Sequence, residues 1–411
     1  MAEEAKKQGS VESAPYFHHG FRWYVLFVFA LLNALTLFTV MCCAGVSPII
    51  MEQYQIDAQA FSLLTSITYL TGFLTCLFFG SFIDRFGARN TILVGLILGI
   101  IGAIIRAAIP EYWAFLAGNF IIGFTFSALN AGVVKVLRAW FSPKSFNIAI
   151  GIYIATASAA AAIAMNSANA FPSLDAMMWF CVGFYAVCIV LTFFIKNRPA
   201  DGPEDSTKEN ITKYLGKTLK YKSVWIVSIA YFIVYTASTA GNIFMVVALQ
   251  SIKGAPIEVA GTASMLGGFG CLFGSLLLPI VTTKIGSTKP ALLIYSALMA
   301  ITLAAAWIVP GMGAHTIALL FLQAFFLGGL LSGSKALPGQ IPDLPAEYVG
   351  TAGGFQACLQ NLGAFVGPTF ILTPIAGPNM FVLEMLIVAV VVIYFFWCLL
   401  IPKNVGHFKQ D

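Results

Sequence analysis

The sequence predicts an all-α integral membrane protein whose twelve transmembrane helices form two six-helix bundles related by an internal repeat. Three observations predict this fold class. Of the 411 residues, 59% are hydrophobic and only 9% are charged, whereas a soluble protein carries about a quarter charged residues. The apolar residues fall in runs long enough to cross a hydrocarbon core of about 30 Å as helices. A polar insert divides these runs into two sets of six.

The apolar runs lack the alternating pattern of a transmembrane barrel, so each is interpreted as a helix. The predicted spans are 23–46, 61–82, 91–109, 112–138, 148–170, 175–196, 222–249, 258–281, 291–309, 313–337, 349–371 and 377–401. We expect this organisation: a cytoplasmic N-terminal tail at 1–22, an N-terminal six-helix bundle at 23–196, a cytoplasmic linker at 197–221, a C-terminal six-helix bundle at 222–401 and a cytoplasmic tail at 402–411. The linker is expected to contain a short amphipathic helix near 211–219.

The basic residues predict the orientation, because Lys and Arg are retained on the cytoplasmic side of a membrane. With the N-terminus inside, nearly all of them lie on or near cytoplasmic segments, and Arg106 and Lys253 are the exceptions. We expect a multi-pass protein of the cell membrane with both termini cytoplasmic and without a cleaved signal peptide. This bias accounts for the net charge of +5. No groove of aromatic and basic residues indicates binding to nucleic acid.

The cysteines and the catalytic motifs give the next expectations. All eight cysteines lie within or at the ends of apolar runs, without a C-x-x-C pair or histidine companions, so we interpret them as small buried hydrophobes and not as a disulfide or zinc framework. They are Cys42, Cys43, Cys76, Cys181, Cys188, Cys271, Cys358 and Cys398. No H-E-x-x-H, G-x-S-x-G or paired core carboxylates occur. We therefore expect no enzyme, no metal and no cofactor.

Two pairs of segments indicate an internal duplication. "LFFGSFIDRFGARNTILVG" (77–95) has a degraded counterpart in "LLLPIVTTKIGSTKPALLI" (276–294), at an offset of 199 residues. "FSPKSFNIAIG" (141–151) has a counterpart in "DLPAEYVGTAG" (343–353), at an offset of 202. Two weak matches at nearly one offset predict a repeated six-helix unit.

"GSFIDRFGARN" (80–90) resembles the G-x-x-x-D-R-x-G-R-R loop of the major facilitator superfamily, with Ala88 in place of one arginine. "AWFSPKSFNIAIG" (139–151) is similar to that family's segment after the fourth helix. The resemblance implies a secondary transporter that works by rocker-switch alternating access. It also implies that Asp84, Arg85 and Arg89 form a cytoplasmic gate, which holds the two halves together when the carrier opens outward. A tight turn with orientation-setting arginines is the alternative.

The resemblance places the substrate near the bilayer midplane between the halves. Polar residues in the spans that line such a cavity are the candidates, because each costs free energy in lipid. We expect substrate binding by Asn33, Asn130, Lys135, Tyr153, Tyr231, Tyr235, Asn242, Gln323, Lys335, Gln356 and Gln360. For a single polar residue, a hydrogen bond between helices is an equal alternative, and the two lysines could extend to the cytoplasmic surface.

The distribution of charged residues narrows the expected class of substrate. No Asp or Glu lies near the middle of a predicted span, and Asn119 stands where the family's arginine of the fourth helix is expected. We therefore expect a carrier of a small organic anion, such as a carboxylate, that works by uniport, exchange or coupling through the charge of its substrate. The alternatives are a neutral or apolar cargo (an amino acid, nucleoside or drug) and, in a different class, a non-transporting sensor or lipid-moving protein. The expected partners are this substrate and membrane lipids, and the expected state is a monomer.

The resemblance also implies which helices meet across the two halves. The fifth span contains "ATASAAAAIA" (155–164) and the eighth contains "GTASMLGGFGCLFGS" (261–275). Such small residues let helices approach closely and slide. "GPTFILTP" (367–374) is expected to bend the eleventh span.

Overall fold

The computed structural model describes residues 20–141, 143–196, 211–402 and 405. Twelve long helices occupy this part of the chain, which contains no β-strand. The N-terminal bundle consists of α2 (Phe21–Gly45), α4 (Ala58–Phe86), α5 (Ala88–Ala108), α6 (Tyr112–Trp140), α7 (Pro143–Ala164) and α9 (Leu174–Phe193). The C-terminal bundle consists of α11 (Lys222–Lys253), α12 (Ile257–Ile285), α13 (Thr288–Ile308), α14 (Ala314–Ala336), α15 (Ala346–Val366) and α17 (Met380–Leu399).

Short helices occupy the connections. These are α3 (Ser47–Gln53), α8 (Ser167–Ala170), α10 (Ile211–Thr218), the 3-10 helix η2 (Leu337–Gln340), the π-helix η3 (Gly367–Leu372) and α16 (Thr373–Ala376). The predicted linker helix is therefore present as α10. In the eleventh span, where a bend is predicted, α15 continues into the π-helical turn that contains Pro368. Proline removes one backbone donor and favours such a local change of helical pitch.

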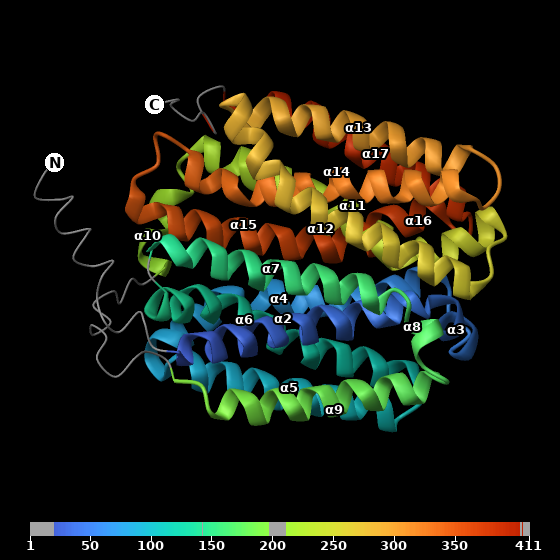
Figure 1. The fold of residues 1–411 in the computed structure, drawn as a ribbon, viewed down its shortest axis with the longest axis horizontal. Helices are drawn as coiled ribbons and strands as arrows, with labels where there is room; N and C mark the ends of the chain where they lie inside the picture. The colour runs from blue at the N-terminus through green and yellow to red at the C-terminus, as the bar shows by residue number, and fades with distance from the viewer. Residues whose placement is uncertain (1–19, 142, 197–210, 403–404, 406–411) are drawn as a thin grey trace, which may run out of the picture.

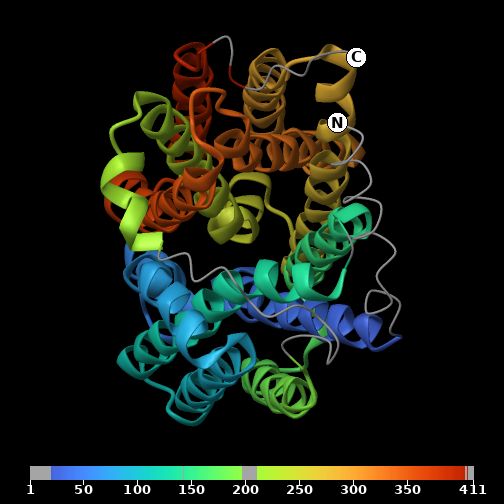
Figure 2. The ribbon, with the colours of Figure 1, turned by 90° about the vertical axis from the view of Figure 1, so that its left-hand side faces the viewer.

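The two bundles lie side by side, with α11–α17 above and α2–α9 below in Figure 1. We call one end of the molecule the termini end, because α2 begins there, α17 ends there and α10 lies there. We call the opposite end, which carries α3, α8 and α16, the far end. Figure 2 shows the molecule from the termini end, where helices of the two bundles face one another. Most of the predicted tails (1–22 and 402–411) and of the predicted linker (197–221) lies outside the described residues.

Helix ends follow local sequence chemistry. The side chain of Asp57 accepts the backbone N–H of Ala60 at 2.8 Å and begins α4, and Ser173 does the same for α9. A side-chain oxygen at this position satisfies one of the backbone donors that a helix start leaves free. Gly254 and Gly286 follow α11 and α12 in the left-handed region, at φ +64° and +73°. Glycine adopts this conformation without a side-chain clash.

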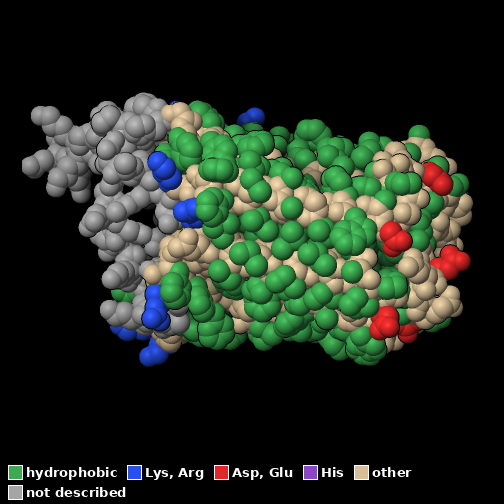
Figure 3. Space-filling model, turned by 90° about the horizontal axis from the view of Figure 1, so that it is seen from below, with side chains coloured by type: hydrophobic (Ala, Val, Ile, Leu, Met, Phe, Trp, Pro, Cys, Tyr) green, Lys and Arg blue, Asp and Glu red, His purple; other side chains and the backbone are tan. Residues whose placement is uncertain are grey.

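The surface and the helix composition indicate a membrane protein. Ten of the helices are long and apolar enough over their described residues to cross a bilayer. Figure 3 shows apolar side chains covering the middle of one face, Lys and Arg gathered toward the termini end, and Asp and Glu toward the far end. Apolar residues such as Val94, Trp113 and Ile301 are more than half exposed. In water such a surface would be unfavourable, whereas lipid accommodates it.

Candidate functional site

Two pairs of helices join the bundles. In the first pair, α4 of the N-terminal bundle packs against α15 and η3 of the C-terminal bundle. We call this contact the α4–α15 seam, defined by Ser62, Ser66, Gly72 and Cys76 on α4 and by Cys358, Asn361 and Thr369 opposite them. The hydroxyl of Thr369 hydrogen bonds to those of Ser66 and Ser62, at 2.7 Å and 3.1 Å. Both hydrogen bonds cross between bundles near the far end.

In the second pair, α7 packs against α12, as the resemblance implied for the fifth and eighth spans. We call this contact the α7–α12 seam. It is defined by Ala162, Met165, Asn166 and Asn169 on one side and by Glu258, Gly261, Thr262 and Gly268 on the other. A Cβ atom built on Gly268 would lie 2.6 Å from the Cβ of Ala162, so the two backbones are in the closest possible approach.

The far end is closed between the bundles. Asn169 donates a hydrogen bond to the carbonyl of Glu258 at 2.9 Å and to the hydroxyl of Thr262 at 3.2 Å. The rings of Phe61 and Phe244, one from each bundle, pack with their centroids 6.2 Å apart. Together with the Thr369 hydrogen bonds, these contacts bring both seams together at the far end.

Toward the termini end, two of the predicted polar residues are exposed. Asn130 lies ten residues before the end of α6, and Lys335 lies in the last turn of α14. The side chain of Lys335 is exposed to solvent. Asn130 thus places an amide group on α6, and Lys335 places an ammonium group on α14. The resemblance implies that these two helices line the substrate path.

In the N-terminal bundle, the structure brings Asn33 and Tyr153 together. The Asn33 amide donates a hydrogen bond to the backbone carbonyl of Tyr153 at 2.7 Å, and both residues are buried. This contact joins α2 to α7, which was the alternative considered for a lone asparagine. The Tyr153 hydroxyl is buried without a hydrogen-bond partner among the described residues. The tyrosine therefore offers a free hydroxyl group.

In the C-terminal bundle, two of the predicted site residues on α11 contact each other. The rings of Tyr231 and Tyr235 pack edge to face, with centroids 4.8 Å apart. Tyr231 is buried, whereas Tyr235 and Asn242 are partly exposed. Gln323 on α14 is buried. The aromatic pair therefore presents Tyr235 toward the space between the bundles, where it packs with Tyr69 of α4 and Phe365 of α15.

The two predicted glutamines of α15 differ in their surroundings. Gln356 is buried and donates a hydrogen bond to the carbonyl of Ser334 at 2.8 Å, so it connects α15 to α14. Gln360, one turn further, is partly exposed. The neighbouring Asn361 is buried, and its amide lies 3.0–3.2 Å from the position of a Cβ atom built on Gly72. Gln360 is thus the better placed of the two glutamines to contact a solute.

The predicted gate residues are only partly described. The side chains of Asp84 and Lys135 lie outside the described residues. Arg89 donates a hydrogen bond to the carbonyl of Phe193 at the end of α9 and stacks on its ring, 5.0 Å from the centroid. Arg85 is exposed and lies over the ring of Phe86. Arg89 therefore binds a helix carboxyl end, as expected, but within its own bundle, and the gate role stays a prediction.

One buried charge lies inside the N-terminal bundle. Arg106, one of the two basic residues that the sequence places away from the cytoplasmic segments, is only 2% exposed. Its Nη1 donates to the carbonyl of Thr39 at 3.2 Å and to Oδ1 of Asn119 at 3.1 Å. Asn119 in turn donates to the carbonyl of Leu64 at 2.8 Å. Arg106 thus ties α5 to α2 and α6. Its position within a long apolar run, four residues before Pro110, was the signal that it is buried.

The interpretation of the cysteines was also wrong for two of the eight. Cys76 and Cys358 form a disulfide with their Cα atoms 6.6 Å apart. The remaining cysteines are free, and all but Cys271 are buried, as expected. Nothing in the spacing of the two residues predicts this pair, because they are 282 residues apart and the fold alone brings them together. In the described part of the chain, no cluster of three or more His, Cys, Asp or Glu residues is arranged to hold a metal.

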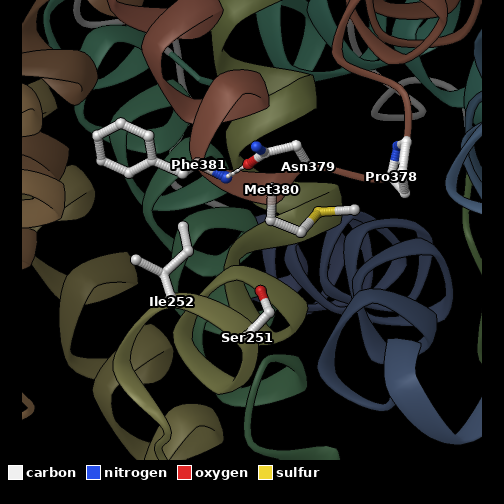
Figure 4. Close-up of a pocket in the computed structure, with 6 residues that line it drawn as sticks. All are labelled: Ser251, Ile252, Pro378, Asn379, Met380 and Phe381. Carbon is white, nitrogen blue, oxygen red and sulfur yellow. Dashed lines mark hydrogen bonds between the residues drawn. The ribbon is translucent and has the colours of Figure 1, made fainter.

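A surface hollow of about 560 Å³ lies at the far end of the C-terminal bundle. Figure 4 shows its lining residues, which are Ser251, Ile252, Pro378, Asn379, Met380 and Phe381. The Oδ1 atom of Asn379 is already used, because it accepts the backbone N–H groups of Phe381 and Val382 at 3.0 Å and 3.2 Å. This hollow lies outside the space between the bundles and contains none of the predicted site residues.

Two bundles of six long helices, joined along two seams, define a multi-pass helical membrane protein. A sequence model of the Major Facilitator Superfamily matches residues 26–368. The chain belongs to this family, and it is accordingly a secondary transporter of a small solute.

Solved structures share this fold over nearly the whole chain. The bacterial homolog to the human lysosomal transporter Spinster, in an inward-facing and unoccupied conformation, superimposes with a TM-score of 0.72 at 15% identity, covering 97% of this chain and 100% of that one. The nucleoside transporter NupG superimposes with a TM-score of 0.76 at 13% identity, covering 93% and 100%. An uncharacterized protein of Archaeoglobus fulgidus is 27% identical over 187 residues, which are 45% of this chain and 82% of that protein.

Proposed function

We propose that this transporter carries a small organic anion, such as a carboxylate, by rocker-switch alternating access, with the termini end facing the cytoplasm. The exposed ammonium group of Lys335, in the last turn of α14 at the termini end, is the observation that carries the proposal. Asn130, Tyr235 and Gln360 are the polar groups that would orient the solute deeper between the bundles. An ammonium group attracts a carboxylate over several ångströms, and more strongly where protein excludes water.

The orientation rests on the charge distribution. Figure 3 shows Lys and Arg toward the termini end and Asp and Glu toward the far end. At the far end the acidic residues are Glu52, Asp57, Glu111, Asp175 and Glu258. This asymmetry is the one that positively charged cytoplasmic loops produce. The contacts between the bundles at the far end would then lie on the side away from the cytoplasm.

A thermal-shift experiment tests the anion assignment. Purified protein is heated with matched pairs of organic acids and their neutral amides, because a ligand that binds only the folded state raises stability by RT ln(1 + [L]/Kd). We expect stabilisation by acids and not by amides, and loss of this stabilisation in Lys335→Ala.

Lys284→Ala is the matched control, since Lys284 lies in the last turn of α12 at the same end and is exposed. It removes the same charge, and we expect it to retain the response to acids. Equal stabilisation by amides, or an unchanged response in Lys335→Ala, would overturn the anion assignment.

A neutral solute is the second candidate, and the edge-to-face pair of Tyr231 and Tyr235 favours it. Aromatic rings bind flat apolar or heterocyclic groups without needing charge. NupG, which shares the fold, is a nucleoside transporter. Stabilisation by nucleosides or amino acids that is lost in Tyr235→Ala and retained in Lys335→Ala would support this candidate.

A further inference from the structure

The disulfide between Cys76 and Cys358 joins the two halves of a protein whose proposed mechanism requires them to move. Cys76 belongs to α4 of the N-terminal bundle and Cys358 to α15 of the C-terminal bundle. All other contacts of the α4–α15 seam are hydrogen bonds or van der Waals contacts, which break and reform on the timescale of transport. A covalent bond does not.

We propose that Cys76 and Cys358 are a reversible thiol–disulfide lock, in which the oxidised pair restricts the rocking of the bundles and the reduced pair releases it. This inference rests on the proposed function, because it takes alternating access as the motion that is restricted.

The position of the pair along the seam supports a lock. Ser66 and Cys76 are ten residues apart on α4, about 15 Å at 1.5 Å per residue. The seam is therefore held at two levels, by the Thr369 hydrogen bonds near the far end and by the disulfide nearer the termini end. One connection would allow α4 to tilt against α15 about that point. Two separated connections fix both the distance and the tilt.

The distance between the Cα atoms makes the restriction directional. Disulfides usually join Cα atoms that are about 4.4–6.8 Å apart, and here the separation is 6.6 Å. The helices could therefore approach one another at this level while the bridge is intact, but they could hardly separate further. The oxidised pair accordingly limits how far the termini end can open for a solute to enter or leave.

The chemistry is thiol–disulfide exchange with a small disulfide such as oxidised glutathione. The Cys76 thiolate attacks one sulfur of the small disulfide, which forms a mixed disulfide and releases one glutathione thiolate. The Cys358 thiolate then attacks the Cys76 sulfur, closes the bridge and releases the second glutathione. The two cysteines lose two electrons, which the small disulfide gains, and a dithiol reductant reverses the sequence. Cys76 reacts first, because it is partly exposed whereas Cys358 is buried.

A second cysteine pair provides a matched control. The Sγ atoms of Cys42 and Cys181 lie 4.0 Å apart, but both residues belong to the N-terminal bundle, in α2 and α9. A bridge between them would join two helices of one bundle and leave the seam free. Cys42→Ser should therefore leave the response to reductant unchanged.

The first experiment detects the bridge without any substrate. A protease site is introduced into the linker segment 197–210 of the full chain, and the cleaved protein is run on a denaturing gel after treatment with oxidised glutathione. We expect the two halves to migrate as one species without reductant and as two species with it. Cys76→Ser should give two species under both conditions. Two species from the oxidised wild-type protein would overturn the proposal.

The second experiment measures the restriction. Hydrogen exchange of the seam helices α4 and α15 should increase when the wild-type protein is reduced, and uptake of the best thermal-shift ligand into liposomes should rise several-fold. Cys76→Ser and Cys358→Ser should show the faster exchange and uptake in both conditions. A disulfide that is detected on the gel but changes neither the hydrogen-exchange rate nor the uptake rate would show that the bundles pivot about it. That result would overturn the lock. If no ligand is transported, the gel and the exchange rates still decide on the lock, so its failure is distinguishable from that of the proposed function.

Discussion

The two seams that join the bundles are built from different chemistry. The α7–α12 seam consists mainly of small residues in direct backbone approach, with Gly268 against Ala162, and has the Asn169 hydrogen bonds only at its far end. The α4–α15 seam consists of polar side chains and a disulfide, with Thr369 between two serines and Cys76 joined to Cys358. The small residues of the α7–α12 seam form an even contact surface that resists compression. The hydrogen bonds and the disulfide of the α4–α15 seam are separate connections that resist separation of the bundles.

This difference indicates that the two seams have different roles in alternating access. Helices with small residues at their contact slide or tilt without losing specific bonds, so the part of the α7–α12 seam around Ala162 and Gly268 suits a surface that moves, and only the Asn169 hydrogen bonds at the far end would have to break. The discrete connections of the α4–α15 seam have two states, made and broken, which suits an element that selects between conformations. Variants at each seam should therefore fail in different ways.

The largest effect is expected from Gly268→Ala in the α7–α12 seam. The new methyl group would lie 2.6 Å from the Cβ and 2.8 Å from the Cα of Ala162, and neither atom can rotate away. Overpacking of this kind costs about 1–3 kcal/mol. We expect a lower melting temperature of the purified protein and slow solute uptake.

The neighbouring Gly267→Ala is the matched control. Its added methyl group would be at least 3.5 Å from any neighbour, and alanine stabilises a helix by about 0.5–1 kcal/mol relative to glycine. We expect an unchanged or higher melting temperature. If both variants behave alike, close approach at Gly268 is not what sets the packing of this seam.

The seams also differ in how far the sequence predicted them. The run of alanines at 155–164 and the glycines at 261–275 indicated the α7–α12 seam, because small residues at helical spacing have one main use in membranes. The α4–α15 seam left no comparable pattern. Ser62, Ser66 and Cys76 are ordinary residues within an apolar run, and their partners are about 300 residues away along the chain.

Physical constraints also explain which helices and side-chain contacts could be predicted from the sequence. The twelve spans were predicted because hydrocarbon thickness fixes helix length and hydrophobicity, and the structure confirms them in the described residues. The surroundings of Asn33 and Gln356 were not predictable, since an amide serves equally well between helices or toward a solute. Only the packing shows that Asn33 binds the Tyr153 carbonyl and that Gln356 binds the Ser334 carbonyl.

A smaller effect is expected from Thr369→Val in the α4–α15 seam. Valine has nearly the same shape but leaves the hydroxyls of Ser62 and Ser66 without their shared partner. A hydrogen bond between membrane helices contributes about 1 kcal/mol or less, and both serines can turn to carbonyls of their own helix. We expect a modest loss of thermal stability, and a double-mutant cycle with Ser66→Ala should measure the coupling.

Thr373→Val is the control for this variant. The Thr373 hydroxyl bonds only to the carbonyls of Pro368 and Thr369 on its own segment, so its loss leaves the connection between bundles intact. A coupling energy of zero between Thr369 and Ser66 would show that the hydrogen bond does not hold the far end closed.

The smallest effect is expected from Gly72→Ala, which tests whether the α4–α15 seam tolerates the change that the α7–α12 seam should not. The added methyl group would meet the end of the Asn361 side chain at 3.0–3.2 Å, and an amide group can shift where a backbone cannot. The gain in helix propensity of about 0.5–1 kcal/mol should offset much of the remaining strain.

We therefore expect the melting temperature of Gly72→Ala to stay near that of the wild-type protein and well above that of Gly268→Ala. The same substitution, glycine to alanine at a contact between the bundles, is compared at both seams, so helix propensity cancels between the two variants. Equal losses would mean that both seams are packed backbone to backbone. Unequal losses in the expected order would show that the α4–α15 seam depends on side-chain connections, which a transporter can make and break.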